Sequence, residues 1–209
     1  MNKPQPGRGH GGFTLIEMIV VMALMIILLL FAVPALLTSM RQGKIRGTAT
    51  ETATLMRLAR LEAIKRSCTS IVRIAEAVDA NPAHVEGFPD CDGDGLADAN
   101  KPTLGSFPLP NGVHFLAPPN LAAEDSVGGL STDPNPDGDA NVAIFQPDGS
   151  IRDIGGFRFG DDAGNFLEVW VAPAATARIE IHKCRACTDA TDRTDWYAAG
   201  EGGEAWQWK

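Results

Sequence analysis

Residues 18–37 form a run without a single charged side chain, and Glu17 stands directly before it. The run reads MIVVMALMIILLLFAVPALL. Together with residues 13–17 it is long enough to cross a bilayer of about 30 Å as an α-helix. A carboxylate that enters the hydrocarbon costs roughly 2.5–3.5 kcal/mol on insertion scales. A plain membrane anchor does not need this charge, so we expect Glu17 to have a partner in the working protein.

A secretory signal peptide does not explain the run. The apolar region of a signal peptide is about 7–15 residues long and is followed by a cleavage site of small residues. Here the run is longer, no A-x-A pattern follows it, and the small residues Gly11 and Gly12 precede it instead. The sequence therefore predicts a helix that stays in the membrane.

The chain divides into four segments by composition and periodicity. Residues 1–12 are polar and rich in Gly and Pro, and residues 13–37 form the transmembrane helix, which Pro34 should kink because it removes a backbone hydrogen bond. Residues 38–66 continue the helix with an apolar stripe that recurs every three or four positions. Residues 67–209 predict a β-rich head with strands near 70–74, 113–116, 142–145, 157–159, 167–171 and 177–182, while 79–112 and 118–141 are predicted to be loops.

These patterns predict an α+β protein, in which one long N-terminal helix packs on a C-terminal head of antiparallel β-sheet. The head is acidic: residues 79–209 contain eight Lys/Arg and 22 Asp/Glu, a net charge of −14. Such a head repels phosphate backbones, which disfavours nucleic-acid binding. Lys183, Arg185 and Arg178 are interpreted as part of a solvated basic turn, and no catalytic arrangement stands out, so we expect no enzyme.

The head contains four cysteines, an even number that favours disulfides in an oxidising compartment and places the head outside the cytoplasm. A redox pair at Cys184 and Cys187 would need a thioredoxin-like unit, which nothing predicts, and a zinc site with Cys68 and Cys91 lacks the usual spacing. We favour two structural disulfides, Cys68 with Cys91 and Cys184 with Cys187. Four cysteines allow three connectivities, and the sequence does not choose between them.

The stretch DCDGDGLAD resembles a calcium-binding loop in its spacing. It places Asp90, Asp92, Asp94 and Asp98 at the first, third, fifth and ninth positions, with a glycine at the sixth. The twelfth position is Lys101 instead of the usual glutamate. The stretch is either a modest calcium site or a solvated Asp/Gly turn, and calcium is the one cofactor that the sequence suggests.

Residues 11–37 resemble the leader and anchor of type IV pilins and of the pseudopilins of type II secretion. In that superfamily, a peptidase cuts a short basic leader after a glycine, the new N-terminal phenylalanine is methylated, and a glutamate follows four residues later. Gly12, Phe13, Glu17 and the mid-helix Pro34 match these positions in order and spacing. The resemblance implies that residues 1–12 are a prepilin leader, that prepilin peptidase cleaves it, and that Glu17 pairs with the amino terminus of a neighbouring subunit.

The head resembles the GspH/FimT family more loosely, through EAIKR at 62–66, IFQPDGS at 144–150 and ARIEIHKC at 177–184. Acidic loops that look inserted, and the Trp-containing end from Thr188, depart from that family. This resemblance implies a pilin-like fold and an H-type minor pseudopilin near the tip of a type II secretion pseudopilus. The protein would be anchored once in the inner membrane of a Gram-negative bacterium, with its head in the periplasm, and would pack against other pseudopilins. Two alternatives stay open: a FimT-like minor type IV pilin that primes pilus assembly and, less favoured because the head is acidic, a pilin for DNA uptake.

Overall fold

The computed structural model describes residues 14–75, 82–97, 102–115, 142–152, 154–184, 196–198 and Trp206. The chain separates into two compact units, residues 1–40 and residues 41–209. One helix, α1 (Leu15–Arg66), contributes residues to both units.

The part of α1 in the first unit exposes apolar side chains along its whole length. Residues 15–40 are all exposed, and an 18-residue window of the helix has a mean hydropathy of 3.1. Among the described residues, α1 is the one helix long and apolar enough to cross a membrane. It runs through Pro34 without interruption, and the hydroxyl of Thr38 donates to the Pro34 carbonyl at 3.1 Å. The kink expected at Pro34 stays a prediction.

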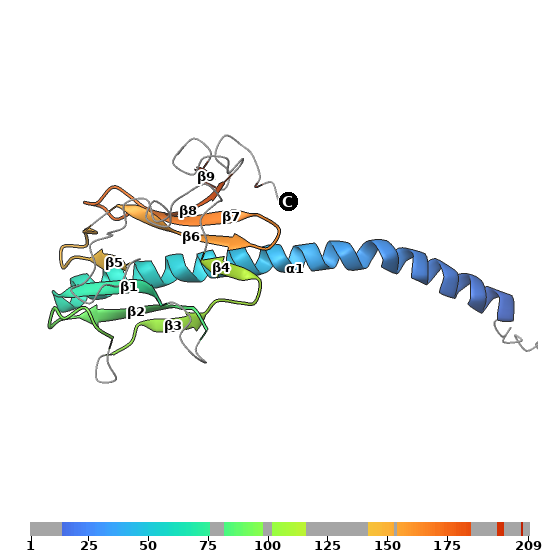
Figure 1. Cartoon of the computed structure of the whole chain (residues 1–209), viewed down its shortest axis with the longest axis horizontal. Coiled ribbons are helices and arrows are strands. Elements are labelled where there is room, and N and C mark those ends of the chain that lie inside the picture. Colours follow the sequence, from blue (N-terminus) through green and yellow to red (C-terminus); the bar gives the residue numbers. More distant parts are fainter. Residues whose placement is uncertain are drawn as a thin grey trace, which may run out of the picture. The chain divides into compact units, whose positions relative to one another are not determined.

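The second unit is built from the rest of α1 and two antiparallel sheets, and Figure 1 shows this part of the helix between them. One sheet has the strand order β3-β2-β1-β5, and the other has the order β4-β6-β7-β8-β9. The strands are β1 (Thr69–Ala75), β2 (His84–Asp90), β3 (Gly105–Pro108), β4 (Val113–Phe115), β5 (Val142–Phe145), β6 (Gly155–Asp161), β7 (Phe166–Val171), β8 (Ile179–Cys184) and β9 (Trp196–Ala198). The expected α+β architecture, a long helix with an antiparallel head, is therefore confirmed.

The core lies where one face of the helix meets the inner faces of both sheets. The helix contributes a stripe of buried residues, Ile45, Ala49, Ala53, Met56, Ala59 and Ala63. Alternate residues of the strands, such as Phe157 and Phe159 of β6, pack against this stripe. The small alanine side chains let the sheets approach the helix closely, so both sheets can pack on one helix.

Three cations of α1 also hold the helix to the backbone of the head. Lys44 Nζ donates to the Asn111 carbonyl at 3.1 Å. Arg57 donates to the Ile179 carbonyl at 3.3 Å, and Arg60 Nε donates to the Gly149 carbonyl at 2.8 Å. These carbonyls belong to different segments, so the helix is tied to the head at three places.

Sequence reasoning missed three strands, β2, β3 and β9, and it predicted a loop over residues 79–112. That prediction is wrong, because the stretch contains β2 and β3. Gly87 and Pro89 weaken the strand signal of β2. Pro89 is tolerated because β3 pairs with His84–Gly87, so among the described residues the second half of β2 pairs with β1 alone. The strands expected near 70–74, 113–116, 142–145, 157–159, 167–171 and 177–182 are present, and the loop expected at 118–141 lies outside the described residues.

The face of the second sheet that points away from α1 buries an ion pair. Arg158 of β6 lies directly opposite Glu168 of β7, and its Nε donates to Glu168 Oε1 at 2.9 Å. Both side chains are almost completely buried. Gly156 makes room for the carboxylate, because a Cβ at this position would lie 2.5 Å from Glu168 Cγ. On the other side of the guanidinium, the ring of Trp196 lies 5.2 Å from Arg158 Cζ, so β9 helps to cover the pair.

We expect Glu168→Ala to lower the free energy of unfolding of the head by about 3–5 kcal/mol, because it leaves the buried Arg158 guanidinium without its carboxylate. Glu51→Ala is the control, since it also removes one carboxylate from the head but at an exposed position of α1. Denaturant unfolding of a fragment of residues 41–209 measures both effects. Equal losses for the two variants would contradict a stabilising role of the buried pair.

Candidate functional site

The N-terminus of α1 is capped by the residues that precede the apolar run. Thr14 stands before the first helical residue, and its hydroxyl oxygen accepts a hydrogen bond from the backbone N–H of Glu17 at 3.2 Å. Thr14 and Glu17 have the spacing of a capping box, in which a threonine is followed three residues later by a glutamate. Sequence reasoning missed this role of Thr14, although the T-x-x-E pattern is legible in the sequence.

Glu17 occupies the first turn of α1 with an exposed side chain. A carboxylate at this position interacts favourably with the positive end of the helix dipole. It is also the one acidic residue of α1 before residue 41. Because its side chain is exposed, it is accessible to a cation supplied from outside the chain. Gly12 and Phe13, the expected processing positions, lie outside the described residues.

The expected disulfide between Cys68 and Cys91 is confirmed, with Cα atoms 4.9 Å apart. Thr69 pairs with Asp90 across β1 and β2, so the two cysteines extend this pairing by one position. The Thr69 hydroxyl also donates to the Asp90 carbonyl at 2.7 Å. The disulfide thus joins the residue before β1 to the residue after β2, which is the second residue of the stretch 90–98, named here the acidic loop. Cys184 is also disulfide-bonded, whereas its expected partner Cys187 lies outside the described residues.

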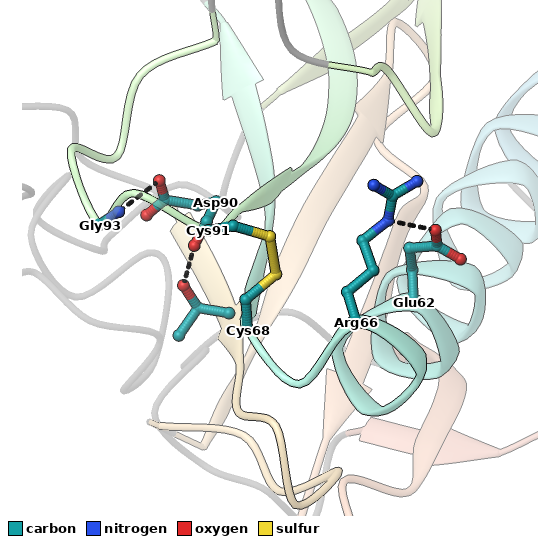
Figure 2. Close-up of a disulfide and its surroundings, with 7 residues drawn as sticks. Glu62, Arg66, Cys68, Asp90, Cys91 and Gly93 are labelled. Atoms are coloured by element: carbon teal, nitrogen blue, oxygen red, sulfur yellow. Dashed lines mark hydrogen bonds and ion pairs between the residues drawn. A yellow bond between two sulfur atoms is a disulfide. The ribbon is translucent and has the colours of Figure 1, made fainter.

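The end of α1 lies close to this disulfide (Figure 2). Glu62 accepts a hydrogen bond from Arg66 one turn later, and this bond holds the pKa of the Glu62 carboxyl below its usual value. The cations of the last turn, Lys65 and Arg66, also suit the negative end of the helix dipole. The helix end is therefore fixed just before the chain enters β1.

Three of the four proposed calcium ligands gather in the acidic loop. One carboxylate oxygen each from Asp90, Asp92 and Asp94 lies within 4.8 Å of the others, while Asp98 is outside the described residues. Asp90 is buried, and its two oxygens accept hydrogen bonds from the N–H groups of Gly93 and Gly95, each at 3.2 Å. Carboxylate oxygens keep further lone pairs, so these bonds leave room for a metal ligand. The donor set fits calcium, which also accepts backbone carbonyls and water.

The basic turn expected around Lys183 is not solvated at Lys183. This residue lies in β8, between Leu167 of β7 and Tyr197 of β9, and its exposed fraction is 3%. Sequence reasoning placed it at the surface because β9 was not foreseen. Arg178 is exposed, as expected, and Arg185 lies outside the described residues.

Comparison with protein families finds a match at the N-terminal end of the chain. Residues 7–33 match the prokaryotic N-terminal methylation motif. The motif supports a type IV pilin-like protein, in agreement with the pilin-like α+β fold. Neither the curated proteins nor the solved structures yielded a match to the chain.

The motif has consequences for processing and placement. It implies cleavage by prepilin peptidase and packing between pilin-like subunits in general. One apolar N-terminal helix with this motif is consistent with a single-pass anchor in the inner membrane. Proteins of this kind are structural subunits, which agrees with the expectation that the chain is not an enzyme.

Calcium at the acidic loop remains a prediction with a direct test. With a Kd of about 10⁻⁴–10⁻³ M, 10 mM calcium should stabilise the head by about 1.4–2.7 kcal/mol, which raises its Tm by roughly 3–10 °C. Thermal melts of residues 41–209 with calcium and with chelator measure this shift. The shift should disappear in Asp92→Ala and persist in Asp162→Ala, a control at an exposed aspartate in another turn. Superimposable melts of the unmodified head with calcium and with chelator would identify the loop as a solvated turn.

Proposed function

We propose that the protein is a minor pseudopilin of a type II secretion system, which assembles through α1 into the tip region of a periplasmic pseudopilus. The observation that carries the proposal is the methylation motif over residues 7–33 together with α1, whose exposed residues 18–37 are all apolar and follow directly on Glu17. Such a surface requires lipid or other helices around it. The inner membrane supplies the lipid, and a filament of packed helices supplies the other helices.

Contacts within the head support the choice of an H-type subunit. Ile64 belongs to EAIKR at 62–66, and Gly149 belongs to IFQPDGS at 144–150, the two stretches that resemble this family. A Cβ at Gly149 would lie 2.8 Å from Ile64 Cδ1, and Gly149 has a φ of 82°, which favours glycine. Arg60 Nε also donates a hydrogen bond to the Gly149 carbonyl, which holds this turn against α1. Two stretches about eighty residues apart in sequence are therefore parts of one structural feature, in which a tight turn caps the end of α1.

In the proposed assembly, Glu17 pairs with the methylated amino group of Phe13 from a neighbouring subunit. Burial of a carboxylate and an ammonium group is favourable only when each finds the other. The pair would therefore act as a register device, since a subunit at the wrong height leaves both charges without a partner. The capping geometry at Thr14 fixes the helix turn that presents the carboxylate.

Processing provides the first test. We expect prepilin peptidase to cleave between Gly12 and Phe13, and the new amino terminus to be methylated. Mass spectrometry of the protein purified from membranes should show a chain that begins at methylated Phe13. A chain that retains Met1 in cells with active prepilin peptidase would contradict the proposal.

The second test separates insertion from assembly. Glu17→Ala should insert into the membrane as well as the unmodified chain, because it removes a charge from the anchor. Its incorporation into filaments should fall more than tenfold, since loss of one partner of a buried ion pair costs about 3–5 kcal/mol. Asp162→Ala, a change at an exposed carboxylate in the turn between β6 and β7 of the head, is the control and should assemble normally. Co-purification with sister subunits and the amount of secreted exoprotein measure the effect. Normal secretion by Glu17→Ala would show that the carboxylate has no role in assembly.

A further inference from the structure

The start of the head carries three positive charges that no carboxylate balances. Arg41, Lys44 and Arg46 all lie on α1 with exposed side chains. The chain contains no Asp or Glu between Glu17 and Glu51, although its net charge is −8. None of the three cations forms an ion pair with a described residue. We use the name basic collar for these three residues.

The position of the basic collar along α1 matches the surface of a bilayer. At 1.5 Å per residue, the uncharged residues 18–37 span about 30 Å, which is the thickness of the hydrocarbon core. Arg41 follows about 6 Å beyond Leu37, and the headgroup layer on each side is about 5–8 Å thick. Lys44 and Arg46 follow at about 10 Å and about 14 Å. Side chains of a helix tilt toward its N-terminus and those of Lys and Arg are long, which brings both charges closer to the headgroups.

Each member of the basic collar keeps hydrogen-bond donors for a phosphate group. Lys44 Nζ donates to the Asn111 carbonyl at 3.1 Å, and an ammonium group has further N–H donors. The guanidinium of Arg46 lies over the Trp206 ring, with Cζ 5.2 Å from the ring centre, and this contact leaves the edge of the guanidinium for hydrogen bonds. Arg41 has no hydrogen bond or ion pair with a described residue. The head therefore orients two of the cations and leaves all three able to bind an oxygen anion.

A phospholipid whose headgroup has a net negative charge fits these cations best. Its phosphate oxygens accept charge-assisted hydrogen bonds from Arg and Lys. A zwitterionic headgroup carries an ammonium group of its own, which would lie among three cations and be repelled by them. Successive residues of a helix are about 100° apart, so Arg46 lies on a different side of α1 from Arg41 and Lys44. The basic collar therefore has room for more than one lipid around the helix.

The orientation of the chain adds an independent argument. The cytoplasmic flank of a membrane helix usually carries the excess of Lys and Arg. In the proposed orientation, the disulfide-containing head is outside the cytoplasm, so the basic collar lies on the opposite flank. Cleavage after Gly12 would remove Lys3 and Arg8, which leaves the basic collar as the nearest side-chain cations on either flank. The positive-inside rule does not explain this placement, which indicates a separate role for these cations.

We propose that the basic collar binds the phosphate groups of anionic phospholipids in the leaflet next to the head. This site goes beyond the proposed function, because it requires the membrane anchor but no particular filament. It complements Glu17 at the other end of the uncharged run, since the carboxylate serves a neighbouring subunit whereas the collar holds the start of the head at the membrane surface. Each Lys or Arg close to an anionic surface strengthens the attraction roughly fivefold.

Native mass spectrometry of the full chain tests the proposal. The chain is purified from membranes in detergent and mixed with equal amounts of phosphatidylglycerol, which is anionic, and phosphatidylcholine, which is zwitterionic. The lipids that stay bound are then identified by mass. We expect phosphatidylglycerol to be retained roughly tenfold more than phosphatidylcholine or better, since each cation contributes about fivefold. Equal retention of the two lipids by the unmodified chain would overturn the proposal.

Matched charge substitutions assign the preference to the basic collar. Arg41→Gln with Lys44→Gln should abolish most of it, whereas Arg41→Lys with Lys44→Arg should keep it because the charges remain. Arg41→Gln alone removes no contact with a described residue and should lower the preference about fivefold, even if the double variant does not fold. The control, Lys65→Gln with Arg178→Gln, removes two exposed cations elsewhere in the head and should keep the preference. Equal losses in the control and in Arg41→Gln with Lys44→Gln would overturn the collar as the site.

Two further outcomes separate the lipid from a free anion and this site from the proposed function. Replacement of chloride by inorganic phosphate at the same ionic strength should leave phosphatidylglycerol bound, and its displacement would overturn the lipid as the ligand. If Phe13 is methylated and the unmodified chain assembles while both lipids are retained equally, the collar proposal fails and the proposed function stands. If phosphatidylglycerol is preferred but Phe13 is not methylated, the proposed function fails and the collar stands.

Discussion

A single helix has to satisfy two different environments, and the rest of the structure depends on this constraint. Backbone groups of α1 are satisfied within the helix itself, so the segment can enter hydrocarbon without further partners. Its side chains are not satisfied in the same way. Over residues 18–37 they are apolar and exposed, whereas from Ile45 onward one face is covered by two sheets. The uncovered surface explains why a chain of this kind is expected to act as a subunit of an assembly.

The head is organised around the buried stripe of the same helix. Alanines on that stripe allow both sheets to pack on one helix, and the cations beside it reach backbone carbonyls of the head. The disulfide between Cys68 and Cys91 then fixes the point at which the chain leaves β2 and enters the acidic loop. Another face of the helix remains exposed, with Leu58 and Leu61 on it. Packing inside the head therefore determines which helix face is left for a partner.

Sequence reasoning succeeded where a signal is local. The apolar run, the α+β class and the strands with alternating or aromatic-rich patterns, such as β6 and β7, could be predicted because each short segment carries its own periodicity. It failed where a strand depends on its neighbours. β2 contains Gly87 and Pro89, and β9 has three residues, so both are strands mainly because β1 and β8 offer them backbone partners. Without β9, neither the burial of Lys183 nor the aromatic contact of Arg158 could be foreseen.

By itself, the sequence determined that this chain has a membrane-length helix headed by a glutamate, a methylation motif and an acidic β-rich head, because these properties reside in contiguous residues. The tertiary structure decided which distant residues meet. It paired Cys68 with Cys91, brought Asp90, Asp92 and Asp94 together, and buried Glu168 against Arg158. It also left Leu58 and Leu61 exposed, on a face of α1 other than the apolar stripe that the sheets cover. The physical reason is that burial and pairing require residues from distant parts of the sequence to meet, whereas helix formation and membrane insertion depend on residues that are close in sequence.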